Sequence, residues 1–118
     1  MMGFQFENLV LNRVMDFKDR LHLAGATIRS AAPYRIPGRD GVQIDLLVQT
    51  DDVMFVVEVK RRRHIAASII DEVQKKVAKL SRPCRISVRK GLIYDGELAP
   101  AVRRGGYFDA LIDIATMI

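Results

Sequence analysis

The chain has 118 residues, of which 49% are hydrophobic, and this size suits one domain with a modest core. Charged residues make up 28%, the net charge is +5, and every charge-free run is too short to cross a bilayer. A single cysteine, Cys84, excludes a disulfide framework, and no signal-peptide pattern opens the chain. We therefore expect a single domain over residues 1–118, cytoplasmic and without a membrane partner.

The first half of the chain predicts one helix followed by strands. Apolar residues recur every three or four positions over residues 5–24, which predicts an amphipathic helix. Residues 26–34 are a weak strand candidate. Two segments rich in Val, Ile, Leu and Phe follow, residues 42–49 and 53–60, and the turn residues between them predict a hairpin centred on Asp51 and Asp52.

The second half predicts a helix, a strand and a short tail. Apolar spacing predicts the helix between Ile65 and Leu80, and the next strand is expected over residues 85–94, ending at Asp95-Gly96. A short helical segment over 99–104 precedes an apolar tail from Phe108 onward. This order of helix, strands, helix and strand describes a small α/β layer.

Two carboxylates interrupt the apolar hairpin strands. Asp45 and Glu58 each lie between aliphatic residues, where a charge loses hydration unless something neutralises it. A turn centred on Asp51 and Asp52 pairs Leu47 with Val56 and places Asp45 opposite Glu58. Such a pair persists when a divalent cation or a shared proton lies between the oxygens. The alternative is a structural ion pair with Lys60 or Arg61.

Lys60 belongs to the same predicted cluster. It follows Glu58 by two residues, so the strand alternation places both side chains on one face. Its ammonium can then orient a water or stabilise charge that develops on a phosphate. Two carboxylates, a lysine and a metal ion together form a hydrolytic site for phosphodiesters.

The pattern of Asp45 followed by Glu58-Val59-Lys60 resembles the signature of the PD-(D/E)XK nuclease superfamily. The resemblance implies a restriction-endonuclease-like αβββαβ core, a mixed central sheet flanked by helices. It implies that Asp45, Glu58 and the backbone carbonyl of Val59 bind Mg²⁺ or Mn²⁺, and that Lys60 is catalytic. Ile44 replaces the proline of the signature, a common departure in this superfamily.

Two further polar residues match positions that this superfamily uses. Glu7, at the edge of the first predicted helix's apolar face, corresponds to an additional acidic metal ligand. Gln74, in the second predicted helix, stands where some branches place a supporting polar residue of the catalytic site. Ala78 stands four residues later, where the exonuclease branch marked by a Gln-Tyr pair has its tyrosine, so that branch is a poor match.

A closer likeness covers nearly the whole chain. Segments 4–10, 41–50 and 106–109 resemble the C-terminal nuclease-like domain of certain prokaryotic P-loop ATPases. The chain has no GxxxxGK[ST] phosphate loop, so the resemblance implies either an ATPase domain upstream or a small stand-alone homologue. It is also compatible with a homodimer.

Basic residues concentrate around the predicted site. Between Lys60 and Lys90 there are eleven of them against two acidic residues, Asp71 and Glu72, which favours a polyanionic partner, most simply a nucleic acid. The alternative is a solvated helix face with its flanking loops. Five of these residues are predicted to contact DNA: Arg61, Arg62, Arg63, Lys75 and Lys76. The lysines of the second helix, Lys75, Lys76 and Lys79, are expected to be exposed.

Two functions remain open from the sequence. The first is a Mg²⁺-dependent DNA endonuclease, or the nuclease module of a larger ATPase. The second is a catalytically silent module that keeps the nuclease fold and binds DNA or a partner protein.

Overall fold

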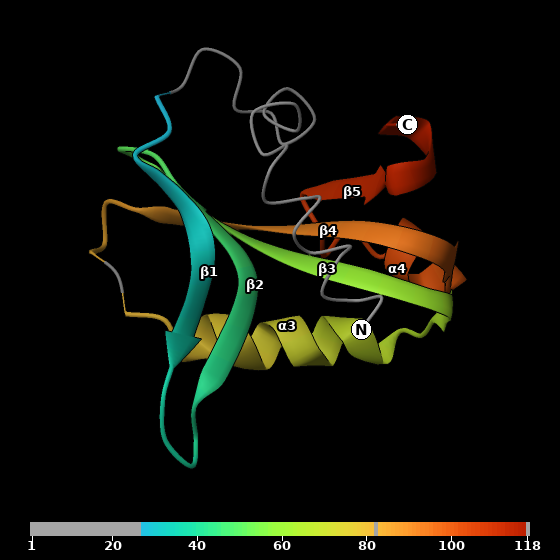
Figure 1. The fold of residues 1–118 in the computed structure, drawn as a ribbon, viewed down its shortest axis with the longest axis horizontal. Coiled ribbons are helices and arrows are strands. Elements are labelled where there is room, and N and C mark those ends of the chain that lie inside the picture. Colours follow the sequence, from blue (N-terminus) through green and yellow to red (C-terminus); the bar gives the residue numbers. More distant parts are fainter. Residues whose placement is uncertain (1–26, 82, 118) are drawn as a thin grey trace.

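The computed structural model describes residues 27–81 and 83–117, which form an α/β structure around a mixed sheet (Figure 1). The predicted helix over residues 5–24, with Glu7, lies outside the described residues. In the described part, five strands form one sheet in the order in which they occur along the chain. They are β1 (Ser30–Ile36), β2 (Val42–Gln49), β3 (Val53–Ile65), β4 (Ser87–Leu98) and β5 (Ala110–Asp113).

The sheet combines antiparallel and parallel pairing. Strand β2 is antiparallel to both β1 and β3, whereas β3, β4 and β5 run parallel. Parallel strands need crossover connections, and these are supplied by helix α3 (Ser68–Ala78) between β3 and β4 and by helix α4 (Pro100–Arg104) between β4 and β5. A short 3₁₀ helix, η1 (Ile114–Met117), follows β5.

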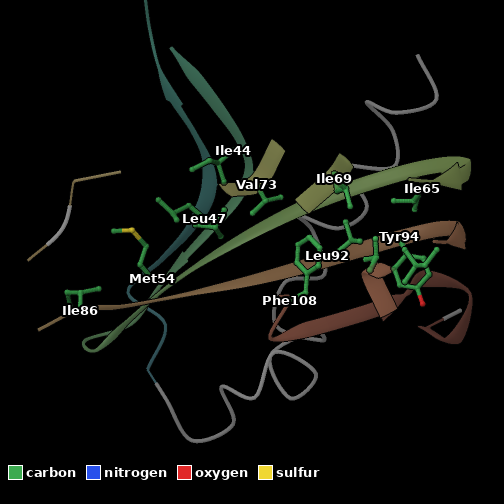
Figure 2. Packing of buried hydrophobic residues seen from close by; sticks show 13 residues of the cluster. Ile44, Leu47, Met54, Ile65, Ile69, Val73, Ile86, Leu92, Tyr94 and Phe108 are labelled. Atoms are coloured by element: carbon green, nitrogen blue, oxygen red, sulfur yellow. The ribbon is translucent and has the colours of Figure 1, made fainter. Parts of the chain in front are cut away.

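Each face of the sheet carries its own apolar cluster, because side chains alternate along a strand. One cluster contains Val56 of β3, Leu92 of β4, and Ile69 and Val73 of α3. Ile69 and Val73 lie one helical turn apart, so they form the buried stripe of α3, and Figure 2 shows them among the buried side chains of the sheet. The short helix α4 adds Val102 to the same cluster.

The other face of the sheet is lined by the alternate residues of the same strands. Phe55 and Val57 of β3 pack there with Ile93 of β4, and Ile114 of η1 packs against them. Both faces are buried along β3, which lies in the middle of the sheet. A charged side chain in the buried part of this strand, residues 54–59, is therefore far from bulk water.

The predicted elements in the described part are present, most of them with different ends. The strand predicted over 42–49 has these bounds in the structure, and the helix predicted between Ile65 and Leu80 is Ser68–Ala78. The weak candidate over 26–34 forms β1 at Ser30–Ile36, and the apolar tail forms β5 and η1.

Two predicted strand ends were wrong, because β3 continues past residue 60 to Ile65 and β4 continues past residue 94 to Leu98. The turn expected at Asp95-Gly96 does not form, because β3 and β4 stay paired as far as Ile65 and Leu98. Arg61 of β3 pairs with Asp95 of β4, and His64 pairs with Glu97. The pairs are three residues apart on β3 but two residues apart on β4, so β3 has a bulge there. Gly96 has φ +139°, and a Cβ on it would lie 1.7 Å from the Arg62 carbonyl oxygen. Glycine thus permits the close approach that lets the ladder continue.

A second bulge lies in β2. Ala32 of β1 pairs with Leu47 of β2, and Tyr34 of β1 pairs with Ile44 of β2. The two pairs are two residues apart on β1 but three residues apart on β2, so β2 has one extra residue. The extra residue falls in the Asp45-Leu46 segment. As a result, Ile44 and Leu47 join the cluster on the α3 face, while Leu46 belongs to the opposite face. A bulge re-aims the side chains around it, and Asp45 lies within this one.

In the part of the chain that the structure describes, no helix is both long enough and apolar enough to span a membrane.

Candidate functional site

Glu58 is the buried charged residue in the middle of the sheet. It lies on β3 on the same face as Val56, toward α3, and the residue is 0% exposed. Its Oε1 accepts a 2.6 Å hydrogen bond from Nζ of Lys76. Its Oε2 is buried and forms no hydrogen bond with the described residues. A buried carboxylate oxygen without a donor is costly, which marks this position as unusual.

The environment of Glu58 disfavours its charge. Burial, followed by the nearby negative charge of Asp45, raises the pKa of Glu58 from its ordinary value of 4.5 to about 7. Lys76 and Lys60 act in the opposite direction but do not cancel these effects. The carboxyl group is therefore poised to exchange a proton, or to gain a cation, near neutral pH.

Asp45 lies beside Glu58 and is held by the main chain. Its Oδ2 accepts a 3.0 Å hydrogen bond from the backbone N–H of Val59, the residue after Glu58. The hairpin register predicted from the turn is confirmed, since Leu47 pairs with Val56. The regular ladder ends at the Leu46–Val57 pair, so Asp45 is placed by its side-chain hydrogen bond instead of by a direct pair with Glu58.

The carbonyl of Val59 faces the same side as its N–H. In a β-strand the N–H and C=O of one residue point to the same neighbouring strand, and the N–H of Val59 points to Asp45. Since the β2–β3 ladder has ended two residues earlier, at Val57, this carbonyl points to the side on which Asp45 lies and is outside the β2–β3 pairing. It is a third oxygen suited to a hard cation.

Lys60 reaches the same cluster, as the alternation predicted. Its Nζ lies 3.9 Å from Oε2 of Glu58 and 3.7 Å from Oε2 of Glu72 on α3. The Lys60 side chain is 18% exposed and that of Glu58 is 1% exposed. The ammonium therefore bridges a buried acid and an exposed one, at the boundary between the core and solvent.

Lys76 differs from its prediction. It was expected to be exposed with Lys75 and Lys79, but its side chain is only 22% exposed and points to Glu58. The reason lies in the helix period, because Lys76 follows the buried Val73 by three positions and so extends the inner stripe of α3. Sequence reasoning also missed Glu72, which lies one turn before Lys76 and contacts Lys60.

The other predicted site residues lie farther out. Gln74 and Lys75 are exposed on α3, and Arg62 and Arg63 are exposed on the extension of β3. Arg61 forms a 3.3 Å ion pair with Asp95 of β4, with both side chains more than two-fifths exposed (44% and 43%). The structure thus brings together Asp45, Glu58, Lys60 and the Val59 backbone, and leaves the arginines near the strand ends.

A surface groove lies beside this cluster, and Lys76 lines it. It has a volume of about 310 Å³ and lies between the start of β2, at residues 41–43, and the side chains of α3. The residues of α3 and its C-cap that line it are one glutamate, Glu72, and three lysines, Lys75, Lys76 and Lys79. Lys76 thus faces both the groove and the buried carboxylate.

The residues present fit a magnesium-type cation. The described residues include no cluster of three or more His, Cys, Asp or Glu side chains that could hold a metal. Mg²⁺, however, commonly binds through one or two carboxylates and keeps several waters. Asp45, Glu58 with its unbonded Oε2, and the Val59 carbonyl meet that requirement.

Comparison of the chain with protein-family models, with curated proteins and with solved structures gave no match. The functional argument therefore rests on the site itself.

Proposed function

We propose that this chain is a metal-dependent DNA endonuclease with a restriction-endonuclease-like, PD-(D/E)XK-type core. The observation that carries the proposal is the fully buried Glu58, whose Oε2 has no hydrogen bond with the described residues, beside a second carboxylate and a lysine. The second carboxylate is that of Asp45. It lies close enough for its negative charge to contribute to the raised pKa of Glu58. A core that only needed stability would be better served by an apolar residue at this position.

A divalent cation would relieve the unfavourable electrostatics of this arrangement. Asp45, Glu58 and the carbonyl of Val59 would hold it, with Glu7 as an additional ligand implied by the resemblance. When bound, Mg²⁺ or Mn²⁺ supplies Lewis-acid polarisation of a phosphodiester and a more acidic bound water. The two carboxylates would hold the cation beside the central strand β3.

Lys60 would act on the substrate from the same strand face. Its ammonium is a compact positive charge at the boundary of the core, suited to stabilise the extra negative charge of a phosphorane-like transition state. Glu72, 3.7 Å from its Nζ, keeps the lysine near the mouth of the site. Gln74 is a supporting polar residue in this proposal.

The substrate is proposed to be DNA because the surface near the site is basic. Arg62 and Arg63 are exposed at the end of β3 beyond Lys60, and Lys75 is exposed on α3 beside the groove. Phosphate contacts from such residues position a duplex without reading its sequence. An upstream ATPase domain or a second copy of the chain is a proposed partner on the strength of the resemblance.

A second function has one observation in its favour. The 2.6 Å ion pair from Lys76 to Glu58 already gives the carboxylate a positive partner, as expected for a silent module in which a lysine takes the place of the metal. Such a module would keep the fold and the basic surface and bind DNA or a protein without cleaving it.

Cleavage assays with defined variants separate the two functions. Purified protein is incubated with supercoiled, single-stranded and branched DNA in Mg²⁺, in Mn²⁺ and in EDTA. The nuclease predicts cleavage that needs the cation and that is abolished in Glu58→Gln and Asp45→Asn but kept in Glu97→Gln, an exposed glutamate on β4. Binding of DNA without cleavage in every cation-containing buffer would instead support the silent module.

A further inference from the structure

Lys76 approaches Glu58 from the solvent side of the site. Its Nζ is 2.6 Å from Oε1, and its side chain is 22% exposed whereas that of Glu58 is 1% exposed. Lys76 also lines the groove between α3 and the start of β2. The ammonium therefore lies between the buried carboxylate and the groove.

The two oxygens of Glu58 have different surroundings. Oε1 is engaged by Lys76, while Oε2 lacks a hydrogen bond with the described residues and has Lys60 at 3.9 Å. A divalent cation on this carboxylate would meet the Lys76 charge within a few ångströms in a poorly hydrated place. Two positive charges at such a distance repel strongly where the effective dielectric constant is low. The ammonium and the cation consequently compete for Glu58.

We propose that Lys76 is the built-in counter-ion of Glu58, and that a divalent cation binds there only by displacing it. The inference deepens the proposed function and rests on it, because it concerns the same carboxylate. Lys76 is a positioning residue: it neutralises Glu58 in the metal-free protein and sets the cation concentration that loads the site. The displaced side chain can turn toward Glu72, one helical turn away and also on the groove.

The test is isothermal titration calorimetry, in which the purified protein is titrated with MnCl₂ or MgCl₂ in the absence of DNA. Lys76→Met removes the competing charge and should tighten cation binding by about tenfold or more. Lys76→Arg keeps a positive charge at the position and should stay close to the wild-type affinity. Arg103→Met removes an exposed positive charge from α4, a helix that does not line the groove, and should also leave the affinity close to that of the wild type.

Thermal melts check that each variant is folded before titration. Lys76→Gln serves if Lys76→Met fails to fold, because its amide is neutral yet can donate a hydrogen bond toward Glu58. The same tightening is expected for it as for Lys76→Met.

The outcomes separate this inference from the function on which it rests. Tighter binding in Lys76→Met or Lys76→Gln, but not in Arg103→Met, supports the counter-ion role. Equal affinity in the wild type and in all variants overturns that role and leaves the metal site intact. If the wild type and every folded variant bind neither ion, both the metal site and the competition are refuted, and Lys76 is only a structural partner of Glu58.

Discussion

The backbone N–H of Val59 donates a 3.0 Å hydrogen bond to Oδ2 of Asp45, and this bond brings two carboxylates together. Val59 directly follows Glu58, so a side chain fixed on its amide lies beside the Glu58 carboxyl group. The regular β2–β3 ladder has already ended at Leu46–Val57. The main chain thus holds one acid next to another, and the charge of Asp45 raises the pKa of Glu58.

Replacing Glu58 with Gln should change how stability depends on pH in EDTA. Because the pKa of Glu58 is raised from 4.5 to about 7, the native protein binds this proton more tightly than the unfolded chain. The stabilisation from the neutral carboxyl is complete below pH 4.5 and disappears as the pH rises through about 7. The rise in the pKa of Glu58 from 4.5 to about 7 corresponds to about 3 kcal/mol in the free energy of unfolding.

Urea unfolding of both proteins across this pH window measures the effect. The free energy of unfolding of the wild type should fall with rising pH relative to that of Glu58→Gln, which has no titrating group at this position. Glu97→Gln, at an exposed position, should follow the wild type. Parallel curves for the wild type and Glu58→Gln would show that Glu58 titrates normally.

Lys60→Ala should abolish cleavage and leave most DNA affinity. The lysine is one charge among many in the basic region, so its share of the salt-dependent affinity is small, whereas its proposed role depends on its place beside Glu58. We expect the cleavage rate to fall by about 100-fold or more. Single-turnover cleavage and fluorescence anisotropy measure the two quantities, with Arg103→Ala, at an exposed position on α4, as the control. A residual rate above about one tenth of wild type would remove Lys60 from the mechanism.

Arg62→Ala/Arg63→Ala should weaken DNA binding and reduce its salt dependence. Both residues are exposed at the end of β3, and Arg61 is left in place because it pairs with Asp95. The slope of log K against log salt should become shallower by about 0.9 for each phosphate that the variant no longer neutralises. Arg103→Ala/Arg104→Ala removes two exposed arginines from α4 and is the control. An unaltered slope would mean that the β3 pair faces away from DNA.

The part of the site that could be predicted from sequence is the part fixed by local periodicity. Turn length set the Leu47–Val56 register, and strand alternation placed Glu58 and Lys60 on one face. These features depend only on residues close in the chain. The same is true of the buried stripe of α3.

The features that could not be predicted depend on contacts between distant segments. The bulge at Asp45 exists because β1 and β2 pair with unequal steps, and no residue near Asp45 signals it. The helix period places Lys76 beside the buried stripe of α3, but its pairing with Glu58 depends on how the helix packs on the sheet. The extension of β3 to Ile65 requires the close approach of Gly96 to Arg62.

Asp45→Asn should stabilise the metal-free protein. Asparagine keeps an oxygen that can accept the hydrogen bond from Val59 but removes a negative charge near Glu58. The alternative, in which Asp45 is a structural partner of Lys60 or Arg61, predicts destabilisation. The ion pairs of the two basic residues favour the first view, since Lys60 contacts Glu58 and Glu72 and Arg61 contacts Asp95.

Thermal melts in EDTA and in Mg²⁺ decide between these two views of Asp45. In EDTA the variant should melt several degrees above the wild type, because about 1 kcal/mol moves a domain of this size by roughly 4–8 °C. Mg²⁺ should raise the melting temperature of the wild type, since it binds only the folded state, and should have little effect on Asp45→Asn. Asp52→Asn, at the exposed hairpin turn, should respond to Mg²⁺ as the wild type does. A lower melting temperature for Asp45→Asn in EDTA would contradict carboxylate repulsion and leave the aspartate a structural role.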